Sequence, residues 1–151
     1  MNLQFEITKL NRNILLGLTK NLSLSQYNFI PKGFKNNIAW NLGHILVTQQ
    51  LLVHKLSNID CVVDVDTIKK FGKGSVPQTD YTLEEIEALK AQFLTSVDIT
   101  SDLYDKDTFK TFNVYPTSLG YTINTVEEAI AFSNYHEGIH LGIIIALKKL
   151  V

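Results

Sequence analysis

The chain has 151 residues, of which 45% are hydrophobic and 19% are charged, and its formal net charge is −1. This balance is typical of a globular protein and argues against long disordered segments. A chain close to neutrality also lacks the concentrated positive charge that a nucleic-acid backbone requires, so we expect no nucleic-acid partner.

The first half of the chain predicts two helices. Over residues 3–22, apolar side chains recur at helical spacing and form one stripe: Leu3, Ile7, Leu10, Ile14 and Leu18. A short connection, residues 23–35, follows this helix. The second helix is predicted to begin at Asn36 or Asn37, because both are favourable N-caps, and to run to about residue 56.

The second half predicts two more helices, each preceded by a long connection. Thr82-Leu83-Glu84-Glu85 and Thr125-Val126-Glu127-Glu128 are capping boxes, and each opens a predicted helix. These helices run to about residue 100 and about residue 149. The connections, residues 57–81 and 101–124, are long for a compact domain, which indicates a function or a small structural element of their own.

Four helices with one apolar stripe each can bury those stripes only against one another. We therefore expect an all-α four-helix bundle in which residues 1–151 form a single domain. The longest apolar run, residues 141–147, is far shorter than the ~20 residues that span a bilayer, and no secretory signal is visible. Cys61 is the one cysteine, so no internal disulfide can form. These features predict a cytoplasmic protein that does not bind membranes.

Three histidines interrupt the stripes that should face the core. His44 lies on the second helix in line with Trp40 and Leu51, while His136 and His140 are four residues apart on the last helix. That spacing places the last two on one face, with Cβ atoms roughly 5–6 Å apart. Buried imidazoles need partners, and side chains of facing helices build metal sites in bundles. We predict one divalent metal ion on the three histidines, zinc by default, with nickel, copper and iron also compatible.

Other interpretations of these residues are open. The histidines could be core residues without a metal, and residues 136–140 also match the H-E-x-x-H signature of zincin proteases. We disfavour a zincin because its third ligand lies downstream, and residues 141–151 contain no His, Glu or Asp. Glu137 could act as a general base toward a metal-bound water, or cap a surface edge. His54 lies about 80° from the His44 stripe on an ideal helix, so we expect it at the surface.

Two motifs resemble the metal-site motifs of the DinB-like (DinB/YfiT-like) superfamily: Trp40-Asn41-Leu42-Gly43-His44-Ile45 and His136-Glu137-Gly138-Ile139-His140-Leu141-Gly142. The similarity covers nearly the whole chain. It implies a four-helix bundle, usually dimeric, with a nickel or zinc site made by three histidines, and His44, His136 and His140 match those positions. Some members transfer low-molecular-weight thiols such as bacillithiol, mycothiol or glutathione to electrophiles, and one branch isomerises maleylpyruvate with a thiol cofactor.

We therefore expect a metal-dependent enzyme that acts on a small-molecule substrate, either a thiol S-transferase or a hydrolase, and that forms a homodimer as the resemblance implies. Tyr115 and Tyr121, on the connection before the last helix, are candidates for lining the pocket mouth and contacting a cofactor. Packing within the loop is the other explanation, and we favour it slightly. The alternative is a non-catalytic helical module in which the metal is structural or absent.

Overall fold

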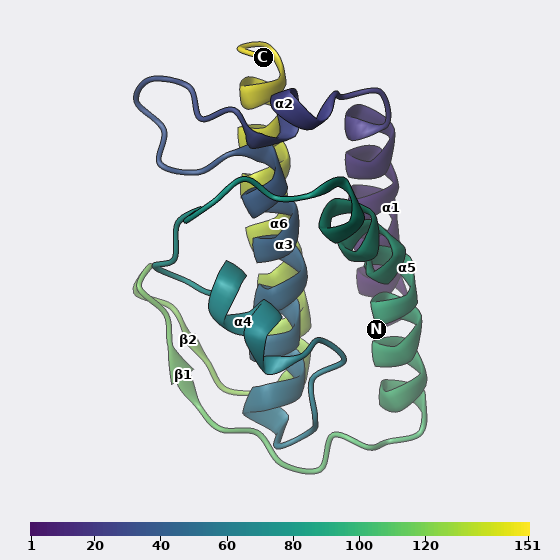
Figure 1. Cartoon of the computed structure of the whole chain (residues 1–151). Coiled ribbons are helices and arrows are strands. Elements are labelled where there is room, and N and C mark those ends of the chain that lie inside the picture. The colour runs from purple at the N-terminus through teal and green to yellow at the C-terminus, as the bar shows by residue number, and fades with distance from the viewer.

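Four helices of 12 to 23 residues form the body of the protein in the computed structural model, which describes residues 1–151. They are α1 (Asn2–Thr19), α3 (Ile38–Gln49), α5 (Leu83–Asp105) and α6 (Val126–Lys148). α1 and α6 run in one direction, and α3 and α5 run in the other (Figure 1). Both α1 and α3 pack against α5 and α6. The predicted all-α class is confirmed. None of the helices combines the length and the apolar character needed to cross a bilayer.

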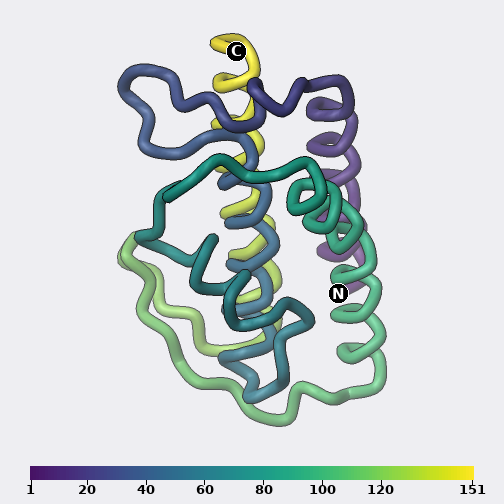
Figure 2. Tube along the Cα trace, in the orientation of Figure 1, coloured from purple at the N-terminus to yellow at the C-terminus, as the bar shows by residue number.

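Two short helices lie within the predicted connections. α2 (Leu24–Asn28) starts at Ser23, which forms a capping box with Gln26. α4 (Val65–Phe71) starts at Asp64, which accepts a hydrogen bond from the backbone N–H of Thr67. α4 packs against α3, and the chain around it can be followed in Figure 2. The length of the connection over residues 57–81 indicated a function or a small structural element, and α4 is such an element.

The helix starts predicted from the sequence agree with the structure. α3 is capped by Asn37, and the capping box at Thr82 is present. Thr125 caps α6, although the Glu128 carboxylate accepts from the backbone N–H of Asn124 rather than from Thr125. The helix ends agree less well: α1 ends at Thr19 instead of residue 22, and α5 continues to Asp105.

The predicted core stripe of α1 is wrong. Leu3, Leu10 and Ile14 are exposed, and the buried residues of this helix are instead Phe5, Thr8, Arg12, Leu15 and Thr19. The physical reason is Arg12, whose guanidinium has hydrogen-bond partners on α3, α5 and α6. Because these partners lie on three different helices, they hold the Arg12 side of α1 toward the core and leave the leucine stripe on the opposite side.

The surface position predicted for His54 is also wrong. α3 continues as a π-helical turn, Gln50–His54, and a 3-10 turn, Lys55–Ser57. His54 at the end of the π-turn is fully buried, with Nε2 2.9 Å from the Thr100 hydroxyl and its ring edge against Phe109. Because every residue from Ile38 to Val47 is buried, this helix is covered on all sides and an angle away from its apolar stripe does not mean exposure.

The buried apolar residues form two separate clusters, and aromatic residues of the connection before α6 pack against the second of them. Phe109, Phe112 and Tyr115 pack against buried residues that include Phe5, Val97 and Ile130. A short antiparallel hairpin closes this segment: β1 (Tyr115–Pro116) pairs with β2 (Thr122–Ile123), and Tyr115 lies opposite Ile123. The hairpin turns at Gly120, whose φ of +82° is one that glycine adopts readily.

Candidate metal centre

Three histidines meet between α3 and α6. His44 comes from α3, and His136 and His140 come from successive turns of α6. Their ring centroids are 5.1 Å (His44–His136), 4.9 Å (His44–His140) and 4.5 Å (His136–His140) apart. One nitrogen from each ring lies within 4.8 Å of the other two, so the group could hold a metal ion. The structure therefore brings together the three residues that the sequence singled out.

The His44 ring is held by α4 and the loop that follows it. Its Nδ1 lies 2.7 Å from the carbonyl oxygen of Phe71 and must donate to it, which leaves the lone pair on Nε2. Nε2 lies 3.4 Å from the Thr48 hydroxyl, too long for a strong hydrogen bond. The Trp40 indole stacks on the imidazole of His44, with 4.4 Å between the ring centroids, and its N–H donates to the Ser75 hydroxyl. The ring is thus fixed in both orientation and tautomer.

Gly43 makes this arrangement possible. A Cβ at this position would lie 2.3 Å from Cδ1 of Phe71, closer than real Cβ contacts. The glycine therefore lets the Phe71 ring pack directly on α3, and Tyr81 stacks behind that ring at 5.2 Å. This close packing places the Phe71 carbonyl against His44.

His140 is held by a side chain of α3. Its Nδ1 lies 2.7 Å from Oδ1 of Asn41, while Nδ2 of Asn41 donates to the backbone carbonyl of Asn37 at 2.7 Å. The second bond identifies which end of the amide is the acceptor, so Nδ1 of His140 carries the proton and Nε2 keeps its lone pair. A hydrogen-bonded partner behind a metal-binding imidazole is a recurrent feature of metal sites.

Burial keeps the three imidazoles neutral. Burial, together with a smaller contribution from the neighbouring histidines, lowers the pKa of His136 to about 4 and that of His140 to about 3. Burial also lowers the pKa of His44. Neutral imidazole is the form that binds metal, so near pH 7 no proton has to be displaced.

His136 differs from the other two because the protein provides it with no polar partner. Its Nδ1 is buried and makes no hydrogen bond. Leaving such a group unsatisfied costs about 1–3 kcal/mol, a cost that a ligand on this nitrogen would remove. The orphaned nitrogen and the three neutral imidazoles fit a divalent ion such as Zn²⁺ or Ni²⁺.

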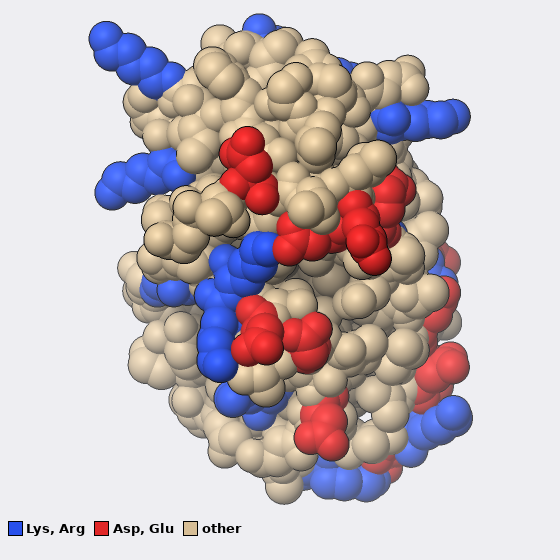
Figure 3. All heavy atoms as spheres, in the orientation of Figure 1, with Lys and Arg blue, Asp and Glu red and all other residues tan.

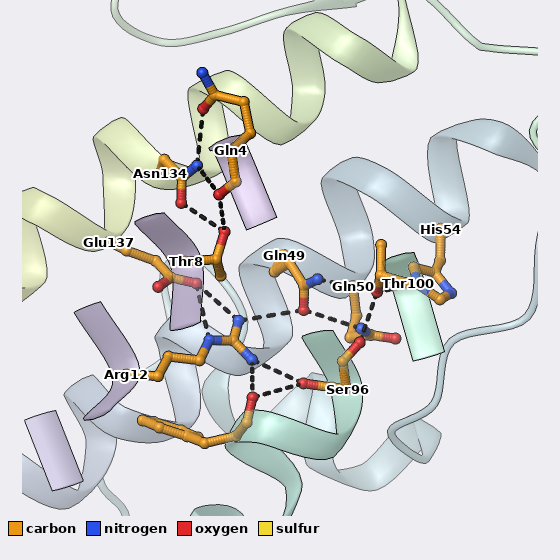
Figure 4. A network of polar contacts seen from close by, with 11 residues as sticks. Gln4, Thr8, Arg12, Gln49, Gln50, His54, Ser96, Thr100, Asn134 and Glu137 are labelled. Carbon is orange, nitrogen blue, oxygen red and sulfur yellow. Dashed lines mark hydrogen bonds and ion pairs between the residues drawn. The ribbon is translucent and has the colours of Figure 1, made fainter. Parts of the chain in front are cut away.

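Glu137 lies in a polar network on the other side of α6, facing α1 (Figure 4). Its Oε1 accepts hydrogen bonds from Nε and Nη2 of Arg12, at 3.1 and 2.7 Å, and both side chains are almost completely buried. Burial raises the pKa of Glu137, and the Arg12 guanidinium opposes this change. The interpretation of Glu137 as a cap at a surface edge is therefore wrong. Its carboxylate is already engaged by Arg12, away from the histidines.

The two tyrosines proposed for the pocket mouth lie in different surroundings. Tyr115 packs on the second apolar cluster. Tyr121 stacks on Phe132 at 6.1 Å and lines a shallow surface pocket with Phe132, Tyr135 and Glu128.

Sequence reasoning missed the groups that orient the site. Asn41 and Gly43 stand within the motif that pointed to His44, but nothing in the sequence assigns them a role. The Phe71 carbonyl is a backbone group 27 residues from its histidine, so it has no side-chain signal at all.

A comparison with known protein families matches residues 7–144 to the DinB superfamily. The matched range includes all of the residues described above around the three histidines. A search of curated proteins finds no match to the chain. Since the family match covers most of the sequence, the chain belongs to the DinB superfamily.

Proposed function

We propose that the protein is a metal-dependent enzyme in which His44, His136 and His140 hold one zinc or nickel ion. The observation that carries the proposal is the convergence of three neutral imidazoles within 4.8 Å. Three protein ligands leave one position of a four-coordinate ion for a substrate, which is the layout of catalytic rather than structural zinc sites. When bound, the ion would lower the pKa of a coordinated thiol or water and so supply a nucleophile near neutral pH.

The reaction class that we favour is transfer of a low-molecular-weight thiol to a small electrophilic substrate, with metal-dependent hydrolysis second. Support for thiol transfer comes from membership of the superfamily, and we propose that the four long helices form its four-helix bundle. The surrounding residues would orient the reactants. Asn41 and the Phe71 carbonyl hold two of the imidazoles, and Trp40 covers one face of His44. The Thr48 hydroxyl is close enough to Nε2 of His44 to hydrogen bond to a substrate atom at the site.

The alternative is a non-catalytic module with a structural metal or none. A structural metal would contribute directly to folding, so its removal would unfold the chain. A catalytic metal at a site held in place by the protein, as here by Asn41 and Phe71, can be removed with the helices intact.

The test is metal content. Protein purified without a metal-binding tag is analysed by mass spectrometry for metals, together with His140→Ala and with His54→Gln, which alters the one histidine outside the group. We expect one metal per chain in the native protein and in His54→Gln, and none in His140→Ala, with the helical circular dichroism retained. Metal-loaded protein is then assayed for consumption of a thiol in the presence of an electrophile. Absence of metal after incubation with zinc or nickel would refute the proposal, and unfolding on chelation would favour the structural alternative.

A further inference from the structure

A surface pocket of about 350 Å³ lies on the solvent-facing side of α6, next to the turn of the β-hairpin. Helix residues three or four apart share a face, and four residues of α6 with this spacing line the pocket together with one tyrosine of the turn. We name it the aromatic pocket and define it by its lining: Tyr121, Glu128, Ala131, Phe132 and Tyr135. Its volume lies within the range of small-molecule sites, which begins at about 300 Å³.

Three aromatic rings form most of the wall of this pocket. The rings of Tyr121 and Phe132 are nearly parallel, with 6.1 Å between their centroids, and the ring of Tyr135 is tilted by 52° against Phe132 at 5.7 Å. About half of each tyrosine is exposed, so these rings are open to a ligand. A cation is attracted to an aromatic ring when it lies within about 6 Å of the centroid. A positive group in the pocket would have more than one ring at this range.

Glu128 is the one charged side chain of the aromatic pocket. Its Oε2 accepts hydrogen bonds from the backbone N–H and from Nδ2 of Asn124, at 2.7 and 3.2 Å, and these contacts hold the carboxylate in place. No group of the protein donates to Oε1, and Glu128 forms no ion pair. The neighbouring Glu127 is not available in the same way, because the Tyr104 hydroxyl donates to it at 2.9 Å.

The negative charge of Glu128 has no basic side chain nearby in the chain to balance it. Between Lys110 and Lys148 the sequence contains no Lys or Arg. On other parts of the surface, by contrast, acidic side chains lie next to basic ones, as Figure 3 shows for one face of the molecule. The aromatic pocket therefore combines apolar rings with a carboxylate that the protein leaves without a counter-ion.

We propose that the aromatic pocket binds a small soluble compound with a quaternary ammonium group. Such a group is a cation covered by methyl groups, so it suits both the rings and the carboxylate, and recognition by aromatic rings is typical of this ligand class. It donates no hydrogen bonds and needs no further acceptors, and Glu128 is the one acidic group that the pocket offers. A primary ammonium is strongly hydrated and would lose water without gaining enough partners here.

The test is a titration with choline, followed by the shifts of its methyl protons in nuclear magnetic resonance. We expect saturable binding at millimolar concentrations, and binding at least tenfold weaker for dimethylbutanol, the uncharged isostere in which carbon replaces nitrogen. Tyr135→Leu should raise the dissociation constant for choline about fivefold, and Glu128→Gln about threefold.

Two variants outside the aromatic pocket are matched controls. Phe29→Leu removes an aromatic ring that is exposed to a similar extent, 51% against 56% for Tyr135, and Glu127→Gln removes the neighbouring charge. Both should leave choline binding unchanged. All four variants should keep the native circular dichroism, because Tyr135 and Phe29 are exposed and glutamine retains the shape of glutamate.

No saturable binding of choline would overturn the proposal. Equal binding of dimethylbutanol would also overturn it, since the pocket would then be an apolar groove without preference for charge. Binding that the controls weaken as much as Tyr135→Leu and Glu128→Gln would place choline elsewhere, and binding to phosphatidylcholine vesicles without binding to free choline would assign the pocket to a lipid surface. Choline should bind His140→Ala as it binds the native chain, so these results and the metal test of the proposed function are independent.

Discussion

Arg12→Met tests whether the buried ion pair with Glu137 holds the helices together. Methionine is unbranched and apolar, so it fills much of the same volume without a charge. Arg12 uses all five of its N–H donors: two bond to Oε1 of Glu137, two to the Phe93 carbonyl and the Ser96 hydroxyl, and one to Gln49. The variant would therefore release contacts to α3, α5 and α6 at once.

The expected loss is large because Glu137 remains. Its Oε2 has no partner in the native protein, so without Arg12 both carboxylate oxygens would be buried and unpaired. Removing one partner of a buried ion pair costs about 3–5 kcal/mol. Since a domain is stable by about 5–15 kcal/mol, Arg12→Met should lose a large part of its free energy of unfolding.

The assay is urea unfolding at pH 7, followed by far-UV circular dichroism. Arg12→Met combined with Glu137→Leu removes both charges, and replacing a whole buried pair by apolar side chains is often nearly neutral. We expect the double variant to recover at least half of the loss. The reasoning would be refuted if Arg12→Met lost less than about 1 kcal/mol, or if the double variant were no more stable than the single one.

Three further outcomes are expected. Gly43→Ala should displace Phe71, destabilise the fold by about 1–3 kcal/mol and weaken zinc binding, which calorimetry measures. Gly17→Ala is the control, because a Cβ at this position meets nothing within 4 Å, and it should have none of these effects. Asn41→Ala removes the acceptor of the His140 Nδ1 proton and should weaken zinc binding about 10–100-fold, so an unchanged affinity would argue against the orienting role. The pKa values of the two α6 histidines are lowered to about 4 and about 3 in the fold from 6.5. The metal-free protein should therefore lose stability as the pH falls below about 6.5, because the unfolded chain takes up protons at a higher pH than the folded chain. Urea titrations at pH 7 and pH 5 measure this change, and a free energy of unfolding that is equal or higher at pH 5 would contradict it.

The sequence predicted most of the features that depend on local signals. Asn37, Thr82 and Thr125 cap the helices that they were expected to cap, since an N-cap acts on backbone groups two or three residues away. The spacing of His136 and His140 likewise fixed their common face. The rotation of α1 was not predictable in this way, because it depends on partners of Arg12 up to 125 residues away along the chain.

The candidate metal centre likewise combines features that the sequence predicted with features that it did not. That three histidines converge follows from their places on two helices that pack together. How the rings are oriented depends on the Phe71 carbonyl of α4, and α4 itself was not predicted as a helix. The burial of His54 depends on Thr100 and Phe109, both distant in sequence, so the helical angle alone gave the wrong answer.

Glu137 shows how a motif can match a catalytic signature and still serve the fold. Neighbouring residues on a helix point about 100° apart, so when His136 turns toward α3, Glu137 turns toward α1. There it meets Arg12, while Asn41 of α3 holds His140. The two contacts act on the same helix from different sides, and both stabilise the rotation of α6 that aligns its histidines with His44. In this chain the glutamate of the H-E-x-x-H string is bound by Arg12, and this contact helps to fix the orientation of α6.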